Sequence, residues 1–307
     1  MVTLSLIDNL FTAATYQGFT FPSYRFLLQE FQPDSFTLAI AAVDEVNKPV
    51  GLGLAEVASD GEFAEILSIF VSPNYRNRGI GNGIIAKLQE ELYLRGCSGA
   101  RLSYNTGQAT TKALERILER QDWLPPQVRQ IVCKWNCQVT QVPWLQKSFR
   151  LPSEFKIFPW AEITEEERLA LKKEQEENLW IPSDLDPFIN EEDFEPLNSL
   201  GLKYHEKVVG WLLTHRISPD TIRYTCSFVR PDLQRMGRVI PLYQEATQRQ
   251  SQRPDIPNVI WTVPASHPAM INFAKRHMAP YLNSLQEIRV SCKLFNPEIW
   301  YNIKQAK

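Results

Sequence analysis

Runs of apolar and β-branched residues, separated by short polar turns, occupy the first half of the chain and predict a series of strands and helices. Residues 45–48 between the first two runs suit an antiparallel hairpin. Apolar positions then recur at helical spacing from Ile80 to Leu92. The predicted order is three strands, a helix, a strand, a helix and a strand, at 37–43, 49–57, 63–71, 79–95, 100–106, 110–121 and 127–138.

The second half of the chain repeats this order. Corresponding residues lie 158 or 159 positions apart: Val71 and Val229, Pro73 and Pro231, Gly79 and Gly237, Cys133 and Cys292. A period this long indicates duplicated domains, because solenoid repeats are only about 20–50 residues long. We therefore expect an N-terminal domain at 1–138, a linker at 139–155 that contains Pro143 and Pro152, and a C-terminal domain at 156–307.

The composition is that of a globular protein without a strong charge. The 307 residues include 33 basic and 35 acidic side chains, for a net charge of −2. This balance gives no support for binding to nucleic acid or to an anionic membrane. The N-terminus lacks the basic start of a signal peptide, and no apolar run approaches the ~20 residues of a membrane helix. We expect a cytoplasmic protein that binds neither nucleic acid nor membrane.

The five cysteines do not predict a metal site. Cys133 and Cys137 are four positions apart, but no second pair of Cys or His stands at the spacing of zinc ligands. We interpret the cysteines as reduced thiols and expect no metal.

The most informative stretch is residues 63–84, FAEILSIFVSPNYRNRGIGNGI, in which a predicted strand passes through a basic, glycine-rich turn into a helix. Backbone N–H groups at such a turn converge and, with the positive end of the helix dipole, form an anion site. Gly79 and Gly81 allow close approach to the backbone, and Arg76 and Arg78 add positive charge. A pyrophosphate is the natural ligand, and the ordinary alternative is a plain strand-to-helix connection.

Two common phosphate motifs do not fit this turn. No Gly-Lys-Ser/Thr follows the glycines, as the P-loop requires. The dinucleotide fingerprint needs an acidic residue about 20 positions further on, and residues 94–101 contain none.

Residues 76–81, Arg-Asn-Arg-Gly-Ile-Gly, are instead similar to the Arg/Gln-x-x-Gly-x-Gly/Ala signature of the GNAT acetyltransferase superfamily. The preceding strand, which ends in Val-Ser-Pro at 71–73, resembles the fourth strand of that family. The resemblance extends over most of both halves and is more specific in the first. It implies an α/β (α+β) fold with two GNAT-like domains, each a mixed, mostly antiparallel twisted sheet flanked by helices. It also implies an N-acetyltransferase with acetyl-CoA as co-substrate.

The resemblance implies where this ligand binds. The pantetheine arm would lie along the backbone of Ile69, Phe70 and Val71, in a gap between the fourth and fifth strands, and Asn105 would line the cleft. The pyrophosphate would bind the turn, whose residues are Arg76, Asn77, Arg78, Gly79, Ile80, Gly81 and Asn82.

Acetyl transfer to an amine needs a base that removes a proton. Residues 63–66, Phe-Ala-Glu-Ile, resemble the histone-acetyltransferase branch of the family, in which the glutamate at this place is the general base. A glutamate within an apolar strand is costly to bury unless it faces a cleft. We therefore assign Glu65 as the catalytic base, with Glu56 in reserve; the alternative is an exposed residue at a strand end. The thioester carbonyl is expected to meet a backbone N–H at a strand bulge near Val71.

The general acid is missing from its usual place. The family carries a tyrosine in its last helix, and Leu118 and Phe273 stand at the corresponding positions of the two copies. Tyr75 and Tyr104 are substitute hydroxyls, and the thiolate of coenzyme A is also a weak enough base to leave without an acid.

The second copy is less well equipped for catalysis. Val239 replaces Gly81, where a β-branched side chain would crowd a phosphate, and Arg223 replaces Glu65. We expect an active first domain and a degenerate, mainly structural second domain.

Two other interpretations stay open at this point. The protein could hold acyl-CoA as a structural or sensing ligand without catalysis, or the duplication could serve protein contacts with no CoA in either half. A small amine, a peptide N-terminus and a lysine all fit as acceptor. Residues 15–31 are expected to cover the acceptor side, and the sequence is compatible with a homodimer.

Overall fold

The computed structural model describes residues 2–33, 35–136, 151–189, 191–234 and 237–295. The chain forms two compact units. Unit 1 comprises residues 1–129 and 287–307, and unit 2 comprises residues 130–286. Within the described ranges, no helix is both long enough and apolar enough to cross a membrane.

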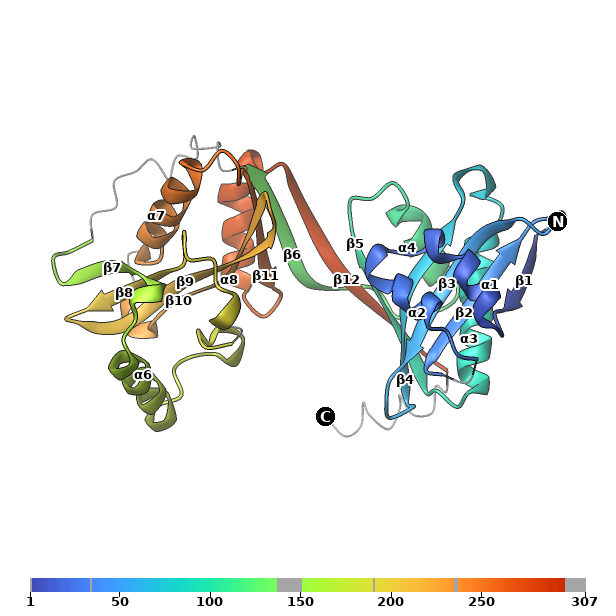
Figure 1. The fold of residues 1–307 in the computed structure, drawn as a ribbon, viewed down its shortest axis with the longest axis horizontal. Helices are drawn as coiled ribbons and strands as arrows, with labels where there is room; N and C mark the ends of the chain where they lie inside the picture. The colour runs from blue at the N-terminus through green and yellow to red at the C-terminus, as the bar shows by residue number, and fades with distance from the viewer. Residues whose placement is uncertain (1, 34, 137–150, 190, 235–236, 296–307) are drawn as a thin grey trace. The chain divides into compact units, whose positions relative to one another are not determined.

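The sheet of unit 1 is mixed and mostly antiparallel, as predicted. In sheet order, its described strands are β1 (Thr3–Leu6), β2 (Thr37–Val43), β3 (Pro49–Val57), β4 (Phe63–Val71), β5 (Gly99–Asn105) and β12 (Ser284–Leu294) (Figure 1). Neighbouring strands pair antiparallel except β4 and β5, which pair parallel. Its helices are α1 (Leu10–Thr15), α2 (Arg25–Gln29), α3 (Ile80–Leu94) and α4 (Thr111–Arg120).

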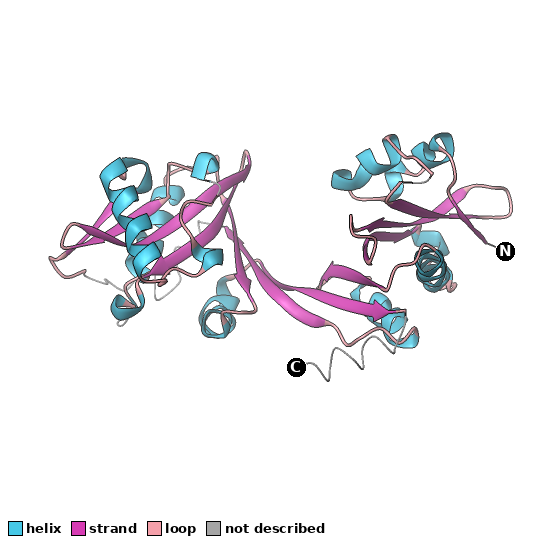
Figure 2. Cartoon of the chain, turned by 90° about the horizontal axis from the view of Figure 1, so that it is seen from below, coloured by secondary structure: helices cyan, strands magenta, loops and turns pink. Residues whose placement is uncertain are grey.

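Helices cover this sheet on two faces, as Figure 2 shows. On the α3–α4 face, Ile84, Ile85 and Leu88 of α3 are fully buried against the sheet. On the α1–α2 face, Ala13 and Leu28 are buried against β2 and β3. The two faces have separate hydrophobic cores, so the direction of each strand residue can be read from the core that it joins.

Glycine in β3 lets α3 lie close to the sheet. A Cβ on Gly53 would overlap Ile84 Cγ2 and would lie 2.9 Å from Leu88 Cδ1. A larger residue at this position would therefore push α3 away from the strands. The close approach holds the start of α3 beside the end of β4, where the glycine-rich turn lies.

Unit 2 has the same architecture. In sheet order, its described strands are β6 (Gln127–Asn136), β11 (Asn258–Pro264), β10 (Thr221–Val229), β9 (Lys207–Ser218), β8 (Leu200–Tyr204) and β7 (Phe155–Pro159). Here β10 and β11 form the parallel pair, at the same place as β4 and β5 in unit 1. Its main helices are α6 (Glu165–Glu177), α7 (Ile240–Ser251) and α8 (Pro268–Phe273).

The last strand of each repeat belongs to the other unit. β12 comes from the second repeat, yet it pairs with β5 of unit 1, from Ile288 opposite Asn105 to Leu294 opposite Gly99. β6 comes from the first repeat and pairs with β11 of unit 2. Unit 1 is therefore discontinuous, and unit 2 is inserted between its two parts.

This division differs from the predicted domains 1–138 and 156–307, which kept each strand with its own repeat. Periodicity predicts a strand but not its partner. The two exchanged strands also carry similar residues, Val-Cys-Lys at 132–134 and Ser-Cys-Lys at 291–293, so their sequences do not distinguish the two pairings. Most of the predicted linker 139–155 lies outside the described residues.

Candidate functional site

β4 and β5 pair only over their first residues. Their last parallel pair joins Ile66 to Leu102. Beyond it, β4 continues to Val71 and β5 to Asn105 without pairing to each other. The pairing of β4 with β3 skips Leu67 at the same level, which marks a β-bulge. The strand gap that the family resemblance implies is therefore present, but the bulge lies at Leu67 rather than near Val71.

Backbone polar groups of β4 face this gap. The Ser72 N–H donates to the Val50 carbonyl at 2.8 Å, so these two residues form a hydrogen-bonded pair of the antiparallel ladder. Because such pairs alternate, Phe70 is bonded to β3, whereas Ile69 and Val71 turn their N–H and C=O groups toward the gap. Two of the three residues expected along pantetheine thus offer backbone groups to it, and Phe70 does not.

The turn after β4 leads into α3 through two residues with positive φ. Asn77 has φ 60°, and Gly79, the residue before the helix, has φ 80°. The Arg76 N–H is already bonded to the Pro73 carbonyl. Among the described residues, none accepts a hydrogen bond from the backbone N–H groups of residues 77–82. These consecutive donors at the positive end of a 15-residue helix suit an anion.

Both arginine side chains of the turn are held in place. Arg76 Nε donates to the last carbonyl of β4 at 3.0 Å. The Arg78 guanidinium lies 5.3 Å from the centre of the Tyr75 ring, and Tyr75 Oη donates to Asp44 at 2.8 Å. Hydrogen bonds from the Lys48 backbone and from Tyr75 hold the pKa of Asp44 below its usual range. An open pocket of about 730 Å³ adjoins the turn and is lined in part by Asp44, Tyr75 and Arg78.

Gly81 directs its Cβ position toward the protein. A Cβ there would lie 3.5 Å from Ile117 Cδ1 of α4 and 3.8 Å from Val71 Cγ2, which are ordinary contacts. Asn82 Oδ1 and its carbonyl oxygen both accept hydrogen bonds from Gln121 Nε2. A β-branched residue at position 81 would therefore press on α4, and the geometry does not support the expected crowding of a phosphate.

We expect Gly81→Ala to stabilise unit 1 by about 0.5–1 kcal/mol, because alanine is favoured over glycine in a helix and its methyl group has room. Chemical denaturation checks this value, and calorimetry with acetyl-CoA, the ligand that the sequence resemblance implies, should show no change in affinity. Gly79→Ala is the contrast, since a φ of 80° is strained for alanine and should cost about 1–2 kcal/mol. A loss of affinity in Gly81→Ala would contradict the inward direction of this position.

Glu65 is bound by Arg101, which no pattern in the sequence indicates as its partner. Its side chain is 31% exposed, and Oε2 accepts from Arg101 Nη2 at 2.6 Å and from Arg101 Nε at 2.8 Å. Oε1 accepts from Ser103 Oγ at 3.3 Å. Glu56, the reserve base, is exposed and lies directly opposite Glu65 in the β3–β4 ladder. The predicted base is thus not buried, and it has partners on both carboxylate oxygens.

Alternation along β5 explains why Arg101 meets Glu65. Ala100 and Leu102 are buried on the α3–α4 face, so Arg101, Ser103 and Asn105 point to the α1–α2 face. Asn105, the predicted cleft residue, is exposed at the end of the strand. The alternation is visible in the sequence, but the register that places Arg101 beside Glu65 is not.

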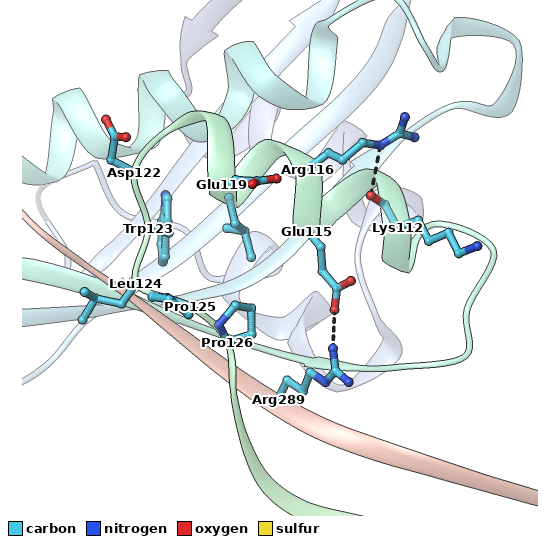
Figure 3. Close-up of a pocket in the computed structure, with 11 residues that line it drawn as sticks. Lys112, Glu115, Arg116, Glu119, Asp122, Trp123, Leu124, Pro125, Pro126 and Arg289 are labelled. Atoms are coloured by element: carbon cyan, nitrogen blue, oxygen red, sulfur yellow. Dashed lines mark hydrogen bonds and ion pairs between the residues drawn. The ribbon is translucent and has the colours of Figure 1, made fainter.

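The two tyrosines considered as substitute acids are bonded elsewhere. Leu118, at the usual tyrosine position, is 1% exposed in the core of the α3–α4 face. Tyr104 Oη donates to Glu115 Oε1 at 2.9 Å, and burial raises the pKa of Tyr104. Arg289 donates to the same oxygen, beside a pocket of about 950 Å³ next to α4 (Figure 3). Tyr75 faces the β2–β3 turn, as described above.

Unit 2 repeats the parting of the strands. The last parallel pair of β10 and β11 joins Tyr224 to Trp261, and β10 continues to Val229. Gln234 occupies the place of Arg76 in the repeat and donates to the Val229 carbonyl at 2.8 Å, as Arg76 does to Val71. The two units therefore share this side-chain hydrogen bond as well as the order of their strands.

Aromatic side chains occupy this region of unit 2. Tyr243 of α7 is buried, its ring contacts those of Tyr224 and Trp261, and its hydroxyl is 2.8 Å from Ser227 Oγ of β10. Pro241 near the start of α7 also removes one backbone N–H. Residues 235–236 of the corresponding turn lie outside the described residues.

Comparison with known proteins agrees with this geometry. Residues 4–118 match the family described as Acetyltransferase (GNAT) family. Among proteins with curated annotation, none matches the sequence. A GCN5-related N-acetyltransferase from Sphaerobacter thermophilus is similar in structure, with 15% identity, a TM-score of 0.58 and 96% of each chain covered.

A tandem GNAT protein from the clavulanic acid biosynthesis pathway is also similar, with 11% identity, a TM-score of 0.57, and 97% of this chain and 99% of that chain covered. At such low identity these two likenesses show the fold alone. The fold extends over both units, and the family match covers most of unit 1. Together they show a match to the GNAT family over residues 4–118 and, over both units, a fold similar to that of these two GNAT proteins.

Proposed function

We propose that unit 1 is an acyl-CoA-dependent N-acetyltransferase that moves an acetyl group from acetyl-CoA to a primary amine. The observation that carries this proposal is the row of backbone N–H groups at residues 77–82, which have no partner among the described residues. It lies at the end of the gap between β4 and β5, where the pantetheine of acetyl-CoA would enter. The GNAT family match over residues 4–118 supports the same ligand.

In this proposal the chain supplies three contacts to the acyl donor. The N–H groups of residues 77–82 bind the pyrophosphate, with the Arg76 and Arg78 side chains beside them. The gap-facing backbone of Ile69 and Val71 pairs with pantetheine like an added strand. The bulge at Leu67 leaves that residue outside the β3 ladder, so its N–H is the candidate donor to the thioester carbonyl.

Glu65 is the proposed base, because it lies two positions before the bulge and on the α1–α2 face. It would take the proton of the acceptor amine as nitrogen attacks the thioester carbon. The bond to sulfur then breaks, and the thiolate of coenzyme A leaves without a dedicated acid, since a thiolate is a weak base.

Acetyl-CoA is expected to stabilise unit 1 against unfolding by about 2.7 kcal/mol at a concentration one hundred times its Kd. Calorimetry gives the Kd, and a thermal melt at several concentrations gives the stabilisation. Pantetheine without the nucleotide is the control and should bind far more weakly, because it lacks the pyrophosphate. No heat and no shift of Tm at millimolar acetyl-CoA would rule out the proposal.

A non-catalytic acyl-CoA-binding module is the second candidate. The burial of Leu118 and the Arg101 contact to Glu65 favour it, because Leu118 has no hydroxyl to act as an acid and the Glu65 carboxylate is already paired. Binding of acetyl-CoA without release of thiol for any member of an amine panel would select this candidate. For unit 2 we propose a structural role, which the packed Tyr243 supports.

A further inference from the structure

Three charged residues lie side by side on three neighbouring strands of unit 1. Glu56 of β3 lies opposite Glu65 of β4, and Glu65 lies opposite Arg101 of β5. We call these three residues the charged row. Their strand neighbours Ala55, Ala64, Ile66, Ala100 and Leu102 are buried in the core of the α3–α4 face. The charged row therefore points to the α1–α2 face.

The charged row lies next to the expected reaction centre. Ile66 and Leu102, the last parallel pair before the gap, directly follow Glu65 and Arg101 in their strands. Ser68, just beyond the bulge, has its hydroxyl 2.7 Å from Thr20 Oγ1 in the segment between α1 and α2. This segment was expected to cover the acceptor side, so an acceptor that approaches the thioester would meet the charged row.

The charged row is accessible but internally paired. The Arg101 side chain is 53% exposed and that of Glu65 is 31% exposed. Arg101 donates two N–H groups to Glu65 Oε2, and Ser103 donates to Oε1. In this state Glu65 has no oxygen that is free of a donor, so it is poorly placed to accept a proton from an amine.

We propose that the acceptor carries a carboxylate close to its reacting amine, as a free amino acid does. This rests on the acetyltransferase function proposed above. The acceptor carboxylate takes the place of Glu65 as the partner of Arg101, and its two oxygens suit a bidentate pair with the guanidinium. Glu65 is then released to hold the ammonium group and to accept its proton, with Glu56 adding negative charge. The two glutamates and the arginine complement a zwitterion, whereas a simple amine would leave Glu65 bound to Arg101.

The test compares acceptors that differ only in this carboxylate. Glycine and glycinamide form one pair, and β-alanine and its amide form another. Release of coenzyme A thiol from acetyl-CoA is measured with each. We expect kcat/KM to be roughly tenfold or more higher for the acids, as a charged hydrogen-bonded pair provides. The amine of an amide is the less basic one, so a preference for the acid cannot arise from a larger free-amine fraction.

Variants of Arg101 then assign the preference. Arg101→Gln should abolish the difference between acid and amide, and Arg101→Lys should restore part of it. Arg120→Gln, on the exposed surface of α4, is the matched control and should leave the difference intact. All variants should bind acetyl-CoA like the wild-type protein, which shows that they fold.

Each outcome separates this inference from the proposed function. Equal rates for acids and amides in the wild-type protein would overturn the inference and leave acetyl transfer standing. So would a preference that persists in Arg101→Gln. Binding of acetyl-CoA without turnover of any acceptor would overturn it together with catalysis, and absence of binding would overturn the acyl-CoA proposal itself.

Discussion

Glu65→Gln is expected to lower kcat for acetyl transfer by roughly 10²- to 10⁴-fold, the usual contribution of a positioned general base. The amide keeps the size of the side chain and can still accept a hydrogen bond from Ser103, but it cannot take a proton from the acceptor. The affinity for acetyl-CoA should not change, because Glu65 lies on the paired part of β4 and away from the turn. Thiol release measures kcat, and calorimetry measures the affinity.

Glu56→Gln is the matched control for this experiment. Glu56 is directly opposite on β3 and carries the same charge, yet among the described residues it forms no ion pair with Arg101. Its replacement should affect KM for the acceptor more than kcat. If Glu65→Gln retained full kcat while Glu56→Gln lost it, the roles of the two carboxylates would be reversed. If neither changed kcat, the charged row would have no part in proton transfer.

Removal of residues 284–307 is expected to unfold unit 1 while most of unit 2 persists. β12 pairs with β5 along seven residues. Its side chains also hold the segment after α4, since Ser291 donates to the Leu124 carbonyl and Lys293 donates to the Gln121 carbonyl. At about 1 kcal/mol for each hydrogen bond lost, the total is comparable with the 5–15 kcal/mol that stabilises a domain.

Hydrogen exchange read by mass spectrometry checks this result for each unit separately. The amides of β4 and β5 should lose protection, and those of β9 and β10 should keep it. A synthetic peptide of residues 284–295 added in excess should restore protection in unit 1. Full protection of β5 in the shortened chain, without peptide, would contradict the assignment of β12 to this sheet.

Local periodicity predicted most of the architecture. β2, β3 and β4 have the predicted bounds, and α3 spans 80–94 where 79–95 was expected. These elements are determined by residues near one another in sequence, and the long repeat extended the same prediction to unit 2. The strand exchange was not predicted, because the choice between β6 and β12 as partner of β5 depends on contacts between residues far apart in the chain.

The candidate site was predictable to the same degree. The free N–H groups at the start of α3 follow from a local rule, since a helix that begins at Ile80, directly after Gly79, leaves its first N–H groups without partners inside the helix. Arg101 could not be identified as the partner of Glu65, because that contact depends on the parallel register of β4 and β5. The direction of Gly81 depends on how α4 packs, and the bulge at Leu67 depends on pairing with β3. The features that the sequence did not predict therefore all depend on how helices and strands pair or pack with one another, and not on the helices and strands themselves.

The discontinuity of unit 1 also determines the order of events during synthesis. Nearly all of unit 2 leaves the ribosome before β12 is complete. During that time β5 lacks its partner β12 and is an unpaired edge strand. At about 5–20 residues per second, this interval lasts roughly ten to forty seconds. An unpaired edge is a template for wrong pairing with other chains. The nascent first half is therefore the part of this protein for which protection by a chaperone would matter most.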